Sequence, residues 1–205
     1  MRLFVIGANG KTGTQLIDLA LPRGHEVTAF VRSPEKIERR HARLQIVRGD
    51  PHDADQLAAA LPGHDAVFSA IGIRPRELFG PITLVQDCAA STVAAMTRAE
   101  VQRFFIVSAA TLFPEKGLRF AFFRWLLKQQ IRDLVAAETI VQATSLEWTI
   151  VRPPRLVRAR EERYRWARGR LPNGALAMSF RAVAAFMLDA AEQGAHGGEI
   201  VGLAG

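Results

Sequence analysis

The chain has 205 residues, of which 49% are hydrophobic, and a formal net charge of +7. A mean hydropathy of +0.06 excludes a disordered chain, and the apolar stretches are too short to span a bilayer. The length predicts one domain over residues 1–205, and a strand that begins directly after Met1 predicts no signal peptide. The single cysteine, Cys88, excludes an internal disulfide and favours a cytoplasmic location.

Segments typical of strands and of helices alternate along the chain. Strands are expected at 3–6, 26–31, 44–47, 66–71, 103–107, 148–151 and 199–203. Helices are expected at 12–21, from 33 onward, and at 53–60, 81–99, about 118–143 and 179–191. This alternation predicts an α/β fold, with a doubly wound, mostly parallel sheet covered by helices on both faces.

Residues 153–178 interrupt this alternation. Asn173-Gly174 lies between Tyr164–Trp166 and Leu176–Met178, and Asn-Gly favours tight hairpin turns. We therefore expect an insertion containing a small hairpin or a long turn. It should lie beyond the carboxyl ends of the strands, where open α/β sheets bind ligands.

Three glycines with the spacing G-x-x-G-x-x-G separate the first strand from the first helix. Such a turn lets the backbone approach a diphosphate, which the free N–H groups and the dipole of the helix N-terminus then stabilise. The sequence therefore predicts dinucleotide binding, because the motif follows a strand and precedes a helix. The residues expected to contact the cofactor here are Gly7, Asn9, Gly10, Lys11, Thr12 and Gly13.

Gly10-Lys11-Thr12 also resembles the end of a nucleotide-triphosphate P-loop. That loop requires a glycine five residues before Gly10, and Val5 occupies this position. The triphosphate interpretation is therefore disfavoured, and Lys11 is expected beside the diphosphate or in solvent.

The end of the second strand predicts which nicotinamide cofactor is preferred. NAD-binding proteins place an acid there for the ribose hydroxyls, whereas this chain has Arg32 and Ser33. Arginine forms paired, charge-assisted hydrogen bonds with phosphate. NADP(H) is therefore expected over NAD(H), unless Arg32 is only a solvated cation.

Two further strand ends are expected near the adenosine half of the cofactor. Asp50 follows the third strand, and its carboxylate is either an acceptor for the adenine amino group or an ordinary helix-entry acid. Ala70, Ile71 and Gly72 end the fourth strand, and the small residues there leave room for the ribose.

These residues resemble the short-chain dehydrogenase/reductase superfamily of Rossmann proteins. More narrowly, they are similar to its atypical branch, which includes NmrA-like proteins and the flavin reductase/biliverdin reductase B type. The similarity rests on the glycine turn, Val31-Arg32, Gly49-Asp50, residues 105–108 (FIVS) and residues 148–153 (WTIVRP). It implies that Ser108 lies near the nicotinamide and that the strand ending in Arg152-Pro153 borders the substrate pocket.

The acid–base half of the superfamily pattern is missing. Ala109 and Ala110 stand where many members carry a catalytic serine, which leaves Ser108 and Thr111 as candidates. The Tyr-x-x-x-Lys pair, whose phenol donates a proton to a forming alkoxide, is absent. Phe120 and Arg124 have the same spacing as this pair but provide no phenol. The candidate substrate residues are Arg124, Pro153 and Arg155.

Eight arginines and two acids lie between Arg152 and Arg170. One or two of the arginines are candidates for holding an anionic substrate. The others are expected in a solvated loop, where they pair with Glu161, with Glu162 or with a partner subunit. No recognition-helix pattern or zinc-ligand spacing supports nucleic-acid binding. The five histidines lack metal-ligand spacing, so no metal is expected.

The leading hypothesis is an NADP(H)-dependent reductase that acts on a small planar or carbonyl-bearing acceptor, such as a flavin- or quinone-like ring. In such enzymes the cofactor supplies the chemistry and solvent supplies the proton. The alternatives are a non-catalytic NADP(H)-sensing regulator and, less favoured, a sugar-nucleotide epimerase or dehydratase. The protein is expected to be a monomer or a homodimer.

Overall fold

The computed structural model describes residues 1–72, 83–113 and 127–205. The strands are β1 (Arg2–Ile6), β2 (Glu26–Val31), β3 (Leu44–Arg48), β4 (Ala66–Ser69), β5 (Arg103–Val107), β6 (Glu147–Arg152), β7 (Arg155–Val157), β8 (Arg165–Arg168), β9 (Ala177–Ser179) and β10 (Glu199–Ala204). The α-helices are α1 (Lys11–Ala20), α2 (Ala54–Ala60), α3 (Leu84–Arg98), α5 (Lys128–Gln142) and α6 (Phe180–Gln193). Two short 3-10 helices are η1 (Pro34–Lys36) and η3 (Ala110–Leu112).

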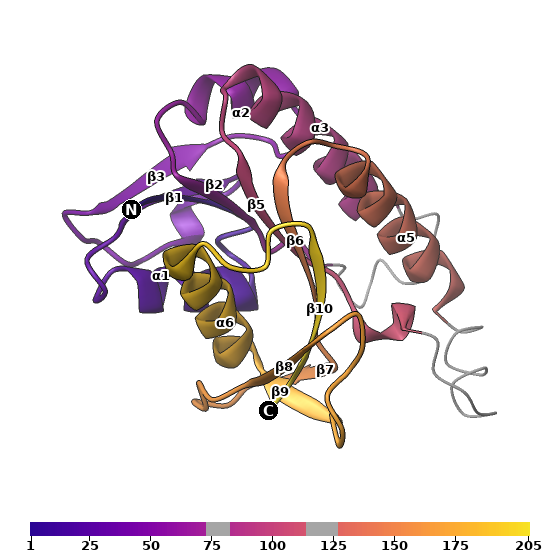
Figure 1. Ribbon diagram of the computed structural model, residues 1–205. Coiled ribbons are helices and arrows are strands. Elements are labelled where there is room, and N and C mark those ends of the chain that lie inside the picture. Colours follow the sequence, from indigo (N-terminus) through magenta and orange to yellow (C-terminus); the bar gives the residue numbers. More distant parts are fainter. Residues whose placement is uncertain (73–82, 114–126) are drawn as a thin grey trace.

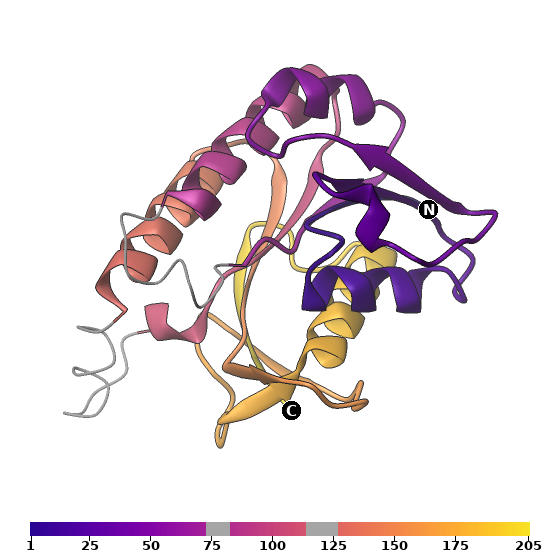
Figure 2. The ribbon, with the colours of Figure 1, turned by 180° about the vertical axis from the view of Figure 1, so that it is seen from behind.

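Eight strands form one sheet in the order β3-β2-β1-β4-β5-β6-β10-β8. All neighbouring strands are parallel except β8, which pairs antiparallel with β10. Helices α1 and α6 cover one face, and α2, α3 and α5 cover the other (Figures 1 and 2). The predicted α/β class, with a mostly parallel sheet and helices on both faces, is confirmed.

Two apolar cores lie on the two faces of the sheet, and β1 contributes to both. Leu3 and Val5 belong to the core beneath α1 and α6, whereas Phe4 and Ile6 belong to the core beneath α2 and α3. Successive strand side chains point to opposite faces, so a strand buried on both sides reads as a continuous apolar run. This explains why the first strand was recognisable from its sequence.

Several predicted boundaries shift in the structure. Strand β4 ends at Ser69 rather than Ile71, and Ser33-Pro34 starts only the three-residue helix η1. Helix α3 begins at Leu84 and α5 at Lys128 in the described residues, so the expected starts of these helices at 81 and 118 fall outside them. None of the helices in the described ranges is long and apolar enough to cross a membrane.

Of the two alternatives for residues 153–178, the hairpin is wrong, whereas a turn does form at Asn173-Gly174. Gly174 adopts a φ of +73°, yet β8 pairs with β10, and β9 pairs in parallel with β7. The reason is tertiary: β10 would otherwise leave an open sheet edge, and β8 covers it. The ring of Trp166 in β8 meets His196 edge-on with the centroids 4.5 Å apart.

Two buried carboxylates tie α5 to its neighbours. Asp133, which is 1% exposed, accepts hydrogen bonds from the backbone N–H groups of Val85 (3.1 Å) and Gln86 (2.9 Å). It therefore caps the N-terminus of α3 from another helix, since Thr83 makes no side-chain cap. The second carboxylate, Glu138, belongs to the candidate site described below.

His64 makes the stability of the fold depend on pH. Its Nδ1 lies 2.8 Å from the carbonyl oxygen of Leu61, which can only accept, and its Nε2 lies 2.8 Å from the hydroxyl of Thr28. The neutral ring, with Nδ1 donating and Nε2 accepting, satisfies both contacts. Burial lowers the pKa of His64 below its usual 6.5.

The unfolded chain therefore takes up a proton on His64 at a higher pH than the folded chain does. The stabilisation from the neutral ring is complete above about pH 6.5 and decreases as the pH falls below this value. Denaturant unfolding should show that the parent protein loses stability between about pH 7.5 and about pH 5.5, and that His64→Gln loses less over the same range. An equal loss in the parent protein and the variant would contradict this assignment.

Candidate functional site

The three glycines shape the turn between β1 and α1. Gly7 has a φ of +77°, and a Cβ placed there would lie 3.0 Å from the carbonyl carbon and oxygen of Ala70. The N–H of Gly10 donates to the carbonyl oxygen of Gly7 at 2.8 Å. A Cβ at Gly13 would collide with the same carbonyl oxygen and lie 2.7 Å from Cα of Ala8. Only glycine fits positions 7 and 13 without moving the backbone.

The N-terminus of α1 opens directly from this turn. Gly10 is the N-cap and offers no side-chain acceptor. The N–H groups of Lys11, Thr12 and Gly13 have no hydrogen-bond acceptor among the described residues, as expected for a first helical turn. These donors and the helix dipole fit a diphosphate, and the close-packed glycines leave it room to approach.

The ends of β2 and β3 lie beside the turn. The side-chain amide of Asn9 donates to the carbonyl oxygen of Ser33 at 2.9 Å and so connects the glycine turn to the end of β2. Arg32 is exposed. Parallel pairing of Val31 with Arg48 brings Arg32 and Asp50 to the same edge of the sheet.

Asp50 keeps its negative charge at this edge. Hydrogen bonds from the N–H and the ring of His52, together with the charge of Arg32, lower the pKa of Asp50. Both His52 contacts go to Oδ1, at 3.1 and 2.8 Å, so Oδ2 has no partner among the described residues. One carboxylate oxygen therefore remains available to an external donor.

The end of β4 completes this half of the site. Ala70 lies against Gly7, and a Cβ at Gly7 would also lie 3.2 Å from the backbone nitrogen of Ile71. A Cβ at Gly72 would meet none of the described residues within 4 Å. The structure thus brings together predicted cofactor residues from four strand ends.

The other half of the site contains a buried network that the sequence analysis missed. The hydroxyl of Ser108, after β5, donates to Oε1 of Glu138 at 2.6 Å. Arg152, at the end of β6, donates to both carboxylate oxygens of Glu138, from Nε at 3.0 Å and from Nη2 at 2.5 Å. Glu138 is only 3% exposed, and the guanidinium of Arg152 lies 4.7 Å from the ring centroid of Phe113.

This network fixes the direction of the Ser108 hydroxyl. A carboxylate accepts hydrogen bonds and donates none, so the hydroxyl proton of Ser108 points to Glu138. The oxygen lone pairs of Ser108 then face away from Glu138. Ser108 is therefore arranged as a hydrogen-bond acceptor rather than as a proton donor.

The remaining predicted substrate and catalytic residues are dispersed. Pro153 is buried and accepts a hydrogen bond from the N–H of Ala110 at 2.9 Å, which places it beside the end of β5. Thr111 is exposed on η3, and Arg155 is exposed on β7. Arg124 lies outside the described residues. No three His, Cys, Asp or Glu side chains converge on a metal position in residues 1–72, 83–113 and 127–205.

Tyr164 has a structural role. Its hydroxyl donates to Asp189 on α6 at 2.6 Å, and its ring meets Phe186 edge-on at 5.4 Å between centroids. Burial and the neighbouring carboxylate raise the pKa of Tyr164 well above its usual range. Because this is the only tyrosine of the chain, no phenol serves as a proton donor at the strand ends.

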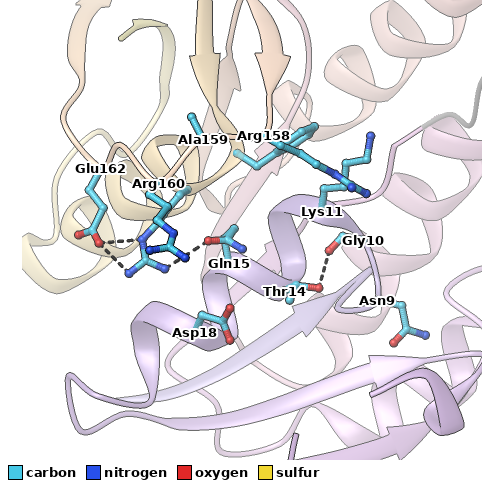
Figure 3. A pocket seen from close by; sticks show the side chains of 12 residues that line it. Asn9, Gly10, Lys11, Thr14, Gln15, Asp18, Arg158, Ala159, Arg160 and Glu162 are labelled. Carbon is cyan, nitrogen blue, oxygen red and sulfur yellow. Dashed lines mark hydrogen bonds and ion pairs between the residues drawn. The ribbon is translucent and has the colours of Figure 1, made fainter. Parts of the chain in front are cut away.

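A cleft of about 1000 Å3 opens next to the glycine turn (Figure 3). One wall is the start of α1, and the opposite wall comes from the arginine segment, defined here as residues 152–170, and from the start of α6. The residues lining it are Asn9, Gly10, Lys11, Thr14, Gln15, Asp18, Arg158, Ala159, Arg160, Glu162, Phe180 and Arg181. The position of the arginine segment opposite α1 was not predicted from the sequence.

Comparison with known proteins agrees with this geometry. Residues 7–194 match the family described as NAD(P)H-binding. The chain belongs to this NAD(P)H-binding family. The uncharacterized sugar epimerase YhfK of Bacillus subtilis is 31% identical over 160 residues, which cover 75% of this chain and 71% of YhfK.

Other relatives match over a smaller part of their length. A chloroplastic protein of Arabidopsis thaliana, At2g34460, is 30% identical over 74% of this chain and 58% of its own length. A 3β-hydroxysteroid dehydrogenase/isomerase of Mycobacterium tuberculosis is 34% identical over 53% of this chain and 31% of its own length. The chain thus spans less than two thirds of these two relatives.

Solved structures share the fold. The oxidoreductase ylbE of Lactococcus lactis superposes with a TM-score of 0.84 at 21% identity, covering 100% of this chain and 90% of that chain. A short-chain dehydrogenase/reductase of Veillonella parvula in complex with NADP gives a TM-score of 0.78 at 20% identity, covering 100% and 94%. The predicted NAD(P)-binding Rossmann family is confirmed, and the solved structures, which include short-chain dehydrogenases/reductases, confirm the fold.

Proposed function

We propose that this NAD(P)H-binding protein is an NADP(H)-dependent reductase with a small planar or carbonyl-bearing acceptor, such as a flavin- or quinone-like ring. The observation that carries the proposal is the glycine turn with Arg32 beside it, which joins a diphosphate cradle to a cation at the end of β2. Gly7, Gly10 and Gly13 would hold the diphosphate, with the N–H groups of the first turn of α1 donating to it.

Arg32 is proposed to select NADP(H) by pairing with the phosphate on the adenosine ribose. Hydrogen bonds to charged groups contribute about 1.5–3 kcal/mol, so Arg32→Asp should weaken NADPH binding about 10- to 100-fold or more. NADH, which lacks that phosphate, should lose much less. Calorimetric titration of both cofactors measures the difference.

Arg163→Asp is the matched control for the change in net charge. Arg163 is 91% exposed, pairs with Glu161 and does not line the cleft, so its substitution should leave both affinities nearly unchanged. Equal losses for NADPH and NADH in Arg32→Asp would remove the proposed preference.

The cofactor, when bound, supplies the hydride. The chain's own residues position the bound molecule and accept a hydrogen bond from it. Because the hydroxyl proton of Ser108 is donated to Glu138, the oxygen of Ser108 can accept a hydrogen bond from an N–H group of that molecule. The hydrogen bond from the N–H of Ala110 to the carbonyl oxygen of Pro153 holds the neighbouring backbone segments together. The proton that accompanies reduction then comes from solvent, which suits acceptors whose reduced form needs no positioned acid.

Turnover tests this chemistry. NADPH consumption should be measured with flavin, quinone and aldehyde acceptors in the parent protein and in Ser108→Ala. Loss of a general acid costs about 10²–10⁴-fold, whereas Ser108→Ala should lower turnover with the best acceptor by about tenfold or less. The pH profile of the variant should match that of the parent. A loss of a thousandfold with a displaced pH profile would show that Ser108 donates a proton.

A second candidate function is a non-catalytic NADP(H)-sensing regulator. The hydroxyl of Tyr164 donates to Asp189 and that of Ser108 donates to Glu138. Neither hydroxyl is therefore free to donate a proton to a substrate, which supports a non-catalytic role. NADPH binding without oxidation by any of the three acceptor classes would favour the regulator. An epimerase is less supported, because the chain lacks the Tyr-x-x-x-Lys pair. Cytoplasmic location and a monomeric or dimeric state stay predictions.

A further inference from the structure

The cleft between α1 and the arginine segment has an excess of positive charge. Four cationic and two acidic side chains line it. Asp18 is paired with Arg39 at 2.5 Å, and Glu162 with Arg181 at 2.7 Å. Both acids are therefore already neutralised by neighbouring arginines.

Three cations are left without an acid. Lys11, Arg158 and Arg160 form no ion pair with a carboxylate among the residues that the structure describes. Lys11 instead lies 5.2 Å from the ring centroid of Phe180, a cation–π contact. Like charges gathered in one concave site repel each other, and an anion relieves the repulsion.

The cleft extends beyond the reach of the diphosphate cradle. Thr14, Gln15 and Asp18 lie on the outer side of α1, and Asp18 is seven residues after Lys11, about 10 Å along the helix axis. Figure 3 shows the arginine segment facing this side of α1. A diphosphate at the first turn of α1 therefore leaves the farther part of the cleft open.

We propose that this cleft binds a small phosphorylated molecule as a second ligand beside the cofactor. Arg158 and Arg160 would hold the phosphate by paired hydrogen bonds, and Lys11 would add a point charge. Phe180 and Ala159 offer an apolar surface to the body of the ligand. A phosphate monoester with a planar organic group fits this combination of charge and surface.

Phenyl phosphate tests the proposal in calorimetric titrations, with phenol as its uncharged counterpart. The full-length protein is used with saturating NADP+, which fills the diphosphate cradle, and again without cofactor. Phenyl phosphate should bind in both conditions and phenol at least tenfold more weakly. Binding that disappears with NADP+ would overturn the proposal, since the anion would then occupy the cofactor's own cradle.

The double variant Arg158→Ser/Arg160→Ser locates the binding. This variant should bind phenyl phosphate at least about tenfold more weakly than the parent. Its fold should be unaffected, because Arg158 and Arg160 are both exposed. Arg163→Ser, in the same segment but outside the cleft, should bind as the parent does. Parent-like binding by the double variant would overturn the proposal, as would equal binding of phenol and phenyl phosphate. The titration without cofactor remains informative even if NADP+ does not bind.

Discussion

Replacing Glu138 by alanine is expected to lower the free energy of unfolding by about 3–5 kcal/mol. The substitution leaves the guanidinium of Arg152, whose side chain is 13% exposed, buried without its carboxylate. It also removes the acceptor of the Ser108 hydroxyl. An uncompensated buried charge is among the costliest single changes in a protein, and denaturant unfolding measures it.

Glu147→Ala is the matched control for this prediction. Glu147 also pairs with an arginine, Arg103, at 3.0 Å, but its side chain is 60% exposed. Exposed ion pairs contribute about 0–1 kcal/mol, so the control should remain close to the parent. If Glu138→Ala were no less stable than Glu147→Ala, the buried network would not hold the ends of β5 and β6 as described.

Gly13→Ala is expected to weaken NADPH binding at least about a hundredfold, which corresponds to about 3 kcal/mol. The added methyl group collides with the carbonyl oxygen of Gly7 and lies 2.7 Å from Cα of Ala8, so the turn must move. A displaced turn no longer aims the N–H groups of α1 at the diphosphate. Overpacking costs about 1–3 kcal/mol of stability, which a domain of this size tolerates.

Gly197→Ala separates loss of binding from a general effect of adding a methyl group. Among the described residues, a Cβ at Gly197 meets only Cβ of Glu147, at 4.0 Å, so this variant should bind NADPH as the parent does. Thermal unfolding of both variants checks that each is folded. Parent-like affinity in a folded Gly13→Ala variant would show that the turn does not carry cofactor binding.

The sequence was sufficient to predict the sheet and the glycine turn because both are local signals. Leu3–Ile6 is a continuous apolar run, and the spacing of Gly7, Gly10 and Gly13 dictates a strand–turn–helix whatever follows. The position of Arg32 at the end of β2 follows from the same local pattern. These features require no knowledge of distant contacts.

The missed features all depend on contacts between distant parts of the chain. Ser108 follows β5, Glu138 lies on α5 and Arg152 ends β6. Only the fold shows that one carboxylate serves both partners. The signal available in the sequence was an acid, Glu138, near the apolar Ala137 and Val141 of a helix, with Arg152 ending the next strand. The hairpin alternative is wrong for the same reason, because β8 pairs with the distant strand β10 at the edge of the sheet.

The glycine turn and Arg32 are proposed to form the NADP(H)-binding site together. Calorimetric titration of the full chain with NADPH and NADH tests this proposal most directly. We expect one site per chain, with NADPH bound at least about tenfold more tightly than NADH. Failure of folded protein to bind either cofactor, or equal affinity for both, would contradict the proposal.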